Sequence, residues 1–140
     1  LQGEIKQLDK CSDSMFATKA MGDGIVIIPT DEVLVSPFNG KVTMIFPTKH
    51  AIGLVSEDGT ELLIHIGLDT VNLDGQPFEV LVQQDQIVKA GQALIKIDLN
   101  MIKKAGLSIE TPILITNHKK FELLVDNNKV NRSDKLMRVM

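Results

Sequence analysis

Two histidines, His50 and His65, are the residues of this chain whose type and placement point most directly to chemistry. His65 lies in the stretch ELLIHIGLD, residues 61–69, in which apolar residues occupy every even position from 62 to 68. A β-strand with this period of two turns one face wholly apolar and presents His65 on the other face. Because an imidazole titrates near neutral pH, a histidine presented in this way can serve as a nucleophile or a metal ligand.

The turn that precedes this strand predicts which residues lie beside His65. If Asp58-Gly59 forms a two-residue hairpin turn, the numbers of paired residues sum to 117, so that His65 faces Ile52 and Gly67 faces His50. The two histidines are then diagonal neighbours on one face, whereas a slip of one residue would place them on opposite faces. The predicted cluster on this face is Thr48, His50, His65 and Asp69.

Structural and metal-binding roles compete with a catalytic role for these histidines. A lone strand histidine is most often merely packed, and the second histidine on the same face favours a site instead. Two histidines are too few for a structural zinc site, which takes four ligands. The H-x-x-x-D spacing of residues 65–69 is like that of small β-rich metallopeptidases, but the companion H-x-H is absent. His118 lies in a polar turn and is interpreted as a solvated surface residue.

Composition excludes several classes of function. The 140 residues are expected to form one domain, 1–140, with a net charge of -3 and 15 scattered Lys and Arg. This charge pattern, together with the absence of Trp and Tyr, argues against nucleic acid as a partner. Cys11 is the only cysteine, which excludes an internal disulfide and a cysteine-rich zinc site and fits a reducing, cytoplasmic setting. No apolar run approaches the ~20 residues that span a bilayer, so no direct membrane insertion is expected.

Short strands separated by turn residues predict the fold. The expected strands are 25–28, 41–46, 50–55, 62–66, 94–97 and 113–116. This spacing predicts an all-β sandwich or barrel. Residues 1–5, 38–42 and 86–94 echo one another weakly, which fits two or more similar hairpin units of a small barrel-sandwich. One short helix is expected after Asp98 as the N-terminal cap, with Gly106 as its stop.

Three stretches make the chain similar to a known family. They are MGDG (21–24), FPTKHAIGL (46–54) and ELLIHIGLDTV (61–71), with further likeness at Asp98-Leu99 and 111–113. The chain resembles the glucose-type enzyme IIA (EIIA) domains of the bacterial phosphoenolpyruvate:sugar phosphotransferase system (PTS). The likeness runs over nearly the whole chain, and only the family's first few residues before Leu1 are expected to be missing.

The resemblance implies an all-β fold, an antiparallel β-sandwich or barrel-sandwich with a duplicated hybrid motif. It also implies a phosphotransferase that accepts a phosphoryl group from the phosphocarrier HPr and donates it to a sugar-specific EIIB domain. By position, His65 matches the histidine phosphorylated on its Nε2 (tele) nitrogen, and His50 matches its phosphoryl-stabilising partner. Thr48 matches the active-site threonine and Asp69 an acidic neighbour. No cofactor is required in this family's reaction, and no metal is expected, although His50 and His65 could bind zinc at a contact with a partner.

The resemblance also implies a partner-binding surface of exposed apolar residues with an acidic rim. The matching positions are Asp13, Met15, Phe16, Ala20, Phe46, Leu63, Asp69 and Val71. An exposed apolar patch of this kind marks a docking surface. The alternative function is a regulatory binding module, controlling transporters or enzymes, whose partners change with phosphorylation. The sequence of this domain is not expected to show which sugar is transported, since sugar specificity belongs to other domains of the system.

Overall fold

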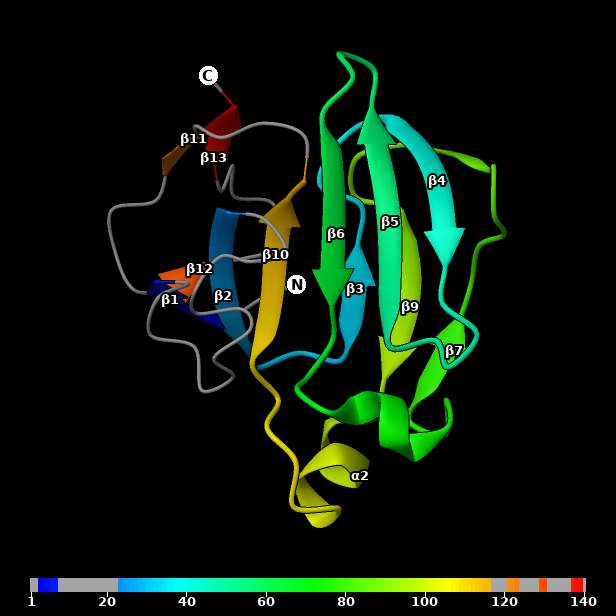
Figure 1. Cartoon of the computed structure of the whole chain (residues 1–140), viewed down its shortest axis with the longest axis vertical. Coiled ribbons are helices and arrows are strands. Elements are labelled where there is room, and N and C mark those ends of the chain that lie inside the picture. Colours follow the sequence, from blue (N-terminus) through cyan, green and yellow to red (C-terminus); the bar gives the residue numbers. More distant parts are fainter. Residues whose placement is uncertain (1–2, 8–22, 117–120, 124–128, 131–136, 140) are drawn as a thin grey trace.

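The structure of the chain, a computed structural model, describes residues 3–7, 23–116, 121–123, 129–130 and 137–139 (Figure 1). Its strands are β1 (Gly3–Gln7), β2 (Asp23–Pro29), β3 (Val33–Val35), β4 (Gly40–Ile45), β5 (Ala51–Ser56), β6 (Glu61–His65), β7 (Phe78–Val80), β8 (Ile87–Val88), β9 (Ala93–Ile97), β10 (Thr111–Ile115), β11 (Phe121–Leu123), β12 (Lys129–Val130) and β13 (Met137–Val139). The helical elements of the described residues are a 3₁₀ turn, η2 (Thr70–Leu73), and a short α-helix, α2 (Leu99–Lys104).

These strands form an antiparallel sandwich, as expected from the sequence. The larger sheet has the strand order β12-β1-β2-β10-β6-β5-β4-β8, and a smaller sheet, β3-β9-β7, packs behind its β6, β5 and β4 strands (Figure 1). β11 and β13 pair separately. Every strand pairing among the described residues is antiparallel, which confirms the predicted fold class.

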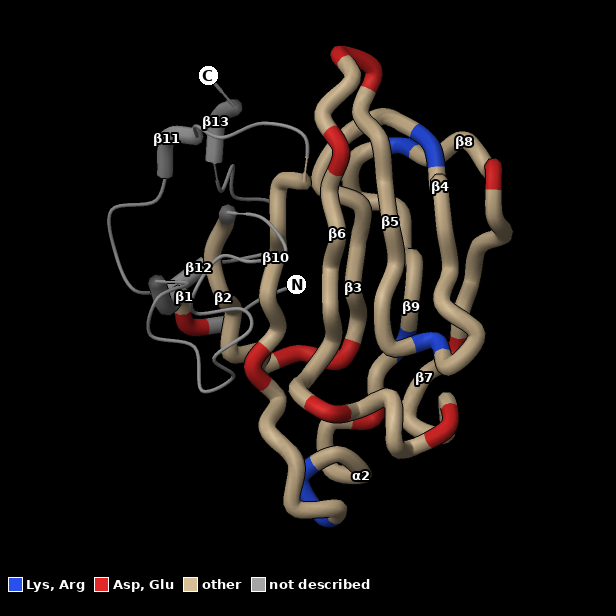
Figure 2. The backbone as a smooth tube through the Cα atoms, in the orientation of Figure 1, with Lys and Arg blue, Asp and Glu red and all other residues tan. Residues whose placement is uncertain are grey.

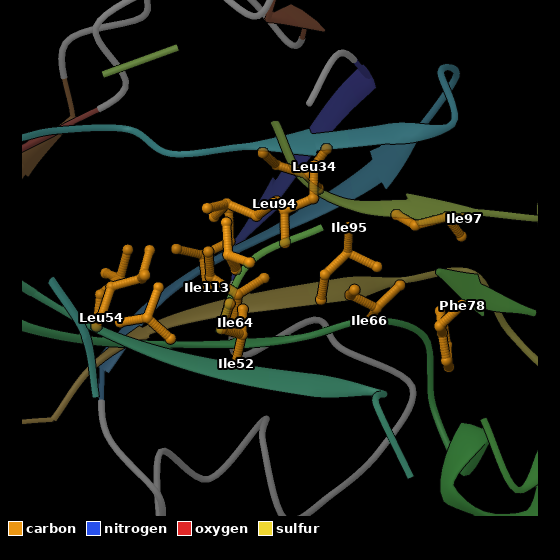
Figure 3. Packing of buried hydrophobic residues seen from close by; sticks show 14 of the residues in the cluster. Leu34, Ile52, Leu54, Ile64, Ile66, Phe78, Leu94, Ile95, Ile97 and Ile113 are labelled. Atoms are coloured by element: carbon orange, nitrogen blue, oxygen red, sulfur yellow. The ribbon is translucent and has the colours of Figure 1, made fainter. Parts of the chain in front are cut away.

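The core between the two sheets explains the alternation in β6. Leu62 and Ile64 are buried in it, while Leu63 and His65 lie on the opposite face and are half-buried. The core side chains come from both sheets and from α2. Figure 3 shows those of the two sheets packed against one another. The apolar face of β6 is therefore held by packing, and the position of His65 follows from that of its buried neighbours.

The predicted register of the β5–β6 hairpin is wrong by one residue. The observed pairs sum to 116, so His65 lies opposite Ala51 rather than Ile52. The reason is the loop, which has three residues instead of two and contains Gly59 with a φ of 90°. The Asp58 carboxylate accepts hydrogen bonds from the Ser56 hydroxyl and from the Thr60 amide and hydroxyl, and so favours this wider loop.

The predicted helix is confirmed. The Asp98 carboxylate accepts a hydrogen bond of 3.1 Å from the Met101 amide as an N-terminal cap, and Gly106 follows the helix with a φ of 79°. Leu99 and Ile102 bury one side of the helix against the core. In the part of the chain that the structure describes, no helix is long and apolar enough to cross a membrane.

Candidate functional site

The turn between β4 and β5 positions His50. The Phe46 amide donates to the Ala51 carbonyl and the Lys49 amide to the Phe46 carbonyl, while Lys49 adopts a φ of 62°. β5 begins only at Ala51, so the strict alternation of a strand does not extend to His50. The His50 ring can therefore approach His65 even though the register differs from the predicted one.

The two imidazole rings are in contact. Their centroids lie 4.7 Å apart at an angle of 71°, and Phe46 packs edge-on against His50 at 5.3 Å. Thr48 contacts the His50 ring as well, with 2.5 Å between its Oγ1 and His50 Nδ1. The structure thus brings together three of the four residues of the predicted cluster.

A backbone carbonyl orients His65. Its Nδ1 lies 2.7 Å from the carbonyl oxygen of Gly67. A carbonyl only accepts hydrogen bonds, so Nδ1 carries the proton and donates it. In the neutral ring this leaves the lone pair on Nε2, which is the nitrogen that can act as a nucleophile.

His50 is held in its neutral form. Burial, and then the positive charge of a protonated His65, lowers the pKa of His50 from 6.5 to about 4. His50 as a residue is only 5% exposed, which fits desolvation as the larger cause. At neutral pH His50 therefore has one ring nitrogen that donates and one that accepts.

This lowered pKa predicts a loss of stability on acidification. His50 binds a proton near pH 6.5 in the unfolded chain but only near pH 4 in the folded one, so the unfolded state gains protons first as the pH falls. We expect the free energy of unfolding to drop by about 3 kcal/mol from this residue between about pH 6.5 and about pH 4.

Urea unfolding at a series of pH values measures this effect. In the His50→Gln variant the fall over the same pH window should be shallower than in the wild type, because glutamine does not titrate. Equal slopes for the two proteins would show that His50 is not the group responsible.

Asp69 takes a different place from the other predicted cluster residues. It is exposed, precedes η2 with a φ of 59°, and its side chain makes no hydrogen bond to Thr48, His50 or His65 among the described contacts. With Asp74 at the other end of η2, it belongs to a group of acidic segments at the end of the sandwich where β6 ends (Figure 2).

The other predicted partner-binding residues divide into two groups. Phe46, which packs against His50, and Leu63, which shares a face of β6 with His65, are half-buried. Val71 is 45% exposed, so all three contribute apolar surface. Asp13, Met15, Phe16 and Ala20 lie outside the described residues. Within the described part of the chain, no group of three or more His, Cys, Asp or Glu is placed to hold a metal ion.

Sequence reasoning missed the group that orients His65. The Gly67 carbonyl is a backbone atom, and the sequence placed Gly67 opposite His50 without indicating a role for its carbonyl. The signal was available in part, since a glycine two residues after a strand histidine favours a turn with positive φ, and Gly67 has a φ of 74°.

Comparisons with known proteins identify the family to which this geometry corresponds. A family model described as phosphoenolpyruvate-dependent sugar phosphotransferase system, EIIA 1, matches residues 1–121. Two curated proteins of Staphylococcus carnosus are similar: a PTS system glucoside-specific EIICBA component, 49% identical over 99% of this chain, and a glucose-specific EIICBA component, 45% identical over 99%. The chain covers only 20% and 21% of their lengths.

The fold also matches a solved structure. Glucose permease IIA from Mycoplasma capricolum superposes with a TM-score of 0.90 and is 42% identical, with 97% of this chain and 89% of that chain covered.

Proposed function

The chain belongs to the EIIA 1 family of the phosphoenolpyruvate-dependent sugar phosphotransferase system, a phosphotransferase component, and from this premise we propose that His65 carries the phosphoryl group. The observation that supports His65 most directly is the hydrogen bond from its Nδ1 to the Gly67 carbonyl. This bond directs the lone pair of the neutral ring to Nε2, as attack on phosphorus requires.

In the proposed step, the lone pair of His65 Nε2 forms a bond to phosphorus while the bond from phosphorus to the donor nitrogen breaks. The electron pair of the broken bond stays on the donor, and Nδ1 of His65 keeps its proton. The phosphorylated ring then carries a positive charge that the Gly67 carbonyl stabilises through the 2.7 Å hydrogen bond. The same geometry serves the reverse direction, in which His65 is the leaving group.

His50 and Thr48 support this transfer. We assign the 2.5 Å contact between Thr48 Oγ1 and His50 Nδ1 as a hydrogen bond that the hydroxyl donates, which leaves the proton of the neutral His50 ring on Nε2. The 4.7 Å between the two ring centroids allows that N–H to donate to an oxygen of a phosphoryl group on His65. The site thus supplies positioning and a donor for the phosphoryl oxygens, which is what phosphoryl transfer needs from a protein, and the proposed step uses no cofactor.

The proposed partners are proteins at each side of the transfer. HPr is the donor and an EIIB domain is the acceptor, and the two similar proteins named above are both EIICBA components. They differ in the sugar that their names give, glucoside in one and glucose in the other, which fits specificity that is set outside this domain. The proposal places the domain in the cytoplasm, where phosphoenolpyruvate is available.

The proposed docking surface surrounds His65. Phe46, Leu63 and Val71 contribute its apolar part and Asp69 its acidic rim, since all four are at least partly exposed. Such a surface buries apolar area against a partner while the charges steer the encounter.

Labelling of the wild-type chain tests the proposal. Incubation with phosphoenolpyruvate, enzyme I and HPr should place one acid-labile, base-stable phosphoryl group on the chain, and ³¹P and ¹⁵N NMR should locate it on Nε2 of His65. A phosphoryl group found on another residue, or on Nδ1 of His65, would contradict the proposal.

A further inference from the structure

Three hydrogen bonds fix the turn that follows β6. The Ile66 amide donates to the His50 carbonyl at 2.7 Å, and the Leu68 amide donates to the Ser108 carbonyl at 3.0 Å. The Thr70 hydroxyl donates to the Ile66 carbonyl at 2.5 Å. The first two hydrogen bonds join backbone atoms. Of the three, only the hydrogen bond from Thr70 involves a side chain, so it is the one that a substitution can remove.

Thr70 also packs against the glycine of this turn. It is 0% exposed, and a Cβ atom placed on Gly67 would lie 2.5 Å from Thr70 Cγ2 and 3.0 Å from the Ser108 carbonyl oxygen. With its φ of 74°, Gly67 occupies a conformation and a space that no larger residue fits without movement. The Thr70 hydroxyl and methyl group therefore touch the two residues that precede Leu68.

The Gly67 carbonyl lies in this turn, and it accepts the hydrogen bond that His65 Nδ1–H donates. We infer that Thr70 is a positioning residue: its buried hydroxyl fixes the turn at Ile66, and the turn aims the Gly67 carbonyl that sets the tautomer and orientation of the His65 ring. This inference rests on the proposed function, in which His65 Nε2 is the nucleophile.

Loss of the Thr70 hydroxyl is expected to slow phosphoryl transfer to His65 by more than the loss of a single hydrogen bond would. If the turn loosens, the Gly67 carbonyl moves and the proton of His65 is shared between Nδ1 and Nε2. Molecules with the proton on Nε2 have no lone pair there and cannot accept a phosphoryl group at that nitrogen. A displacement of about 1 Å at a reacting group can by itself cost on the order of 100-fold in rate.

Variants at Thr70 distinguish the effect of its hydroxyl from the effect of its packing. Thr70→Val keeps the shape of threonine and removes the donor, while Thr70→Ser keeps the donor and removes the methyl group. Thr70→Ala differs from Thr70→Ser by the hydroxyl alone, so this pair carries the test if Thr70→Val fails to fold.

We expect the rate of phosphoryl transfer from phospho-HPr to fall about 10- to 100-fold in Thr70→Val and Thr70→Ala, and to stay within about threefold of wild type in Thr70→Ser. ¹⁵N NMR of the unphosphorylated proteins should show the His65 proton mainly on Nδ1 in the wild type and in Thr70→Ser. In the variants without the hydroxyl it should be distributed over both ring nitrogens. Because an unfolded chain would also share the His65 proton between both ring nitrogens, the tautomers are compared only in variants whose amide NMR spectra show the wild-type fold.

Wild-type rates in Thr70→Val and Thr70→Ala would overturn the inference, as would a Thr70→Ser protein as slow as Thr70→Ala. A fall in rate with an unchanged tautomer would also overturn it, because Thr70 would then act through packing. The tautomer is measured without any phosphoryl donor. A failure of the proposed function, seen as wild-type protein that is not labelled on His65, is therefore distinguishable from a failure of this inference.

Discussion

The His65→Ala variant is expected to lose phosphorylation by phosphoenolpyruvate, enzyme I and HPr completely. Alanine has no lone pair to attack phosphorus, and the neighbouring imidazole cannot take over. His50 Nδ1 is engaged by the Thr48 hydroxyl, and in the proposed tautomer its Nε2 carries a proton. The expected loss is therefore larger than that from any positioning residue.

A matched histidine variant controls for general effects on folding and docking. His118→Ala removes an imidazole from a residue interpreted as solvated, and it should be labelled at the wild-type rate. His118 lies outside the described residues, so this control also tests that interpretation. Labelling that persists in His65→Ala would show that another residue accepts the phosphoryl group.

The architecture was predictable because its signals are local. The six expected strands correspond to β2, β4, β5, β6, β9 and β10. Glycine, asparagine and aspartate residues between them indicated the turns. β1, β8, β11, β12 and β13 were not among the expected strands. β3 and β7 were missed as well, since each is three residues long and too short for a period of two to be counted. They are held by pairing with β9, a contact between distant parts of the chain.

The pairing of His50 with His65 was predicted through a register that is wrong. Asp58-Gly59 indicates a two-residue turn by its composition, but side-chain hydrogen bonds from Ser56 and Thr60 to Asp58 stabilise a three-residue loop. If β5 had continued to His50, the shift of one residue would have placed the two histidines on opposite faces. They stay together because β5 begins at Ala51, so His50 lies in the preceding turn and does not follow the alternation of the strand.

The contacts that set the protonation of the site were not predictable from residue types. They depend on where backbone carbonyls point: that of Gly67 toward His65, and that of Ile66 toward Thr70. A backbone carbonyl is present at every residue, so only the fold determines which one becomes a hydrogen-bond acceptor for a catalytic ring.

The His50→Gln variant is expected to accept the phosphoryl group from phospho-HPr but to pass it on to an EIIB domain about 100-fold more slowly or worse. Glutamine retains an N–H donor for a phosphoryl oxygen, so the accepting step loses little. It has no ring to pack against Phe46 and His65, and it cannot ionise.

The asymmetry between the two steps follows from the charge that phosphorylation adds. A phosphoryl group brings a charge of about -1.5 to -2 next to His50, and a nearby negative charge raises the pKa of an imidazole from the value of about 4 that His50 has in the unphosphorylated site. His50 can thus gain positive character only after His65 is phosphorylated, when the phosphoryl oxygens must be held in line as the group departs. Separate rapid-quench measurements of acceptance and of onward transfer resolve the two steps within one variant, so that acceptance serves as the control. Onward transfer at the wild-type rate in His50→Gln would mean that the charge of His50 has no part in the reaction, and that its imidazole contributes only the hydrogen bond that glutamine can replace.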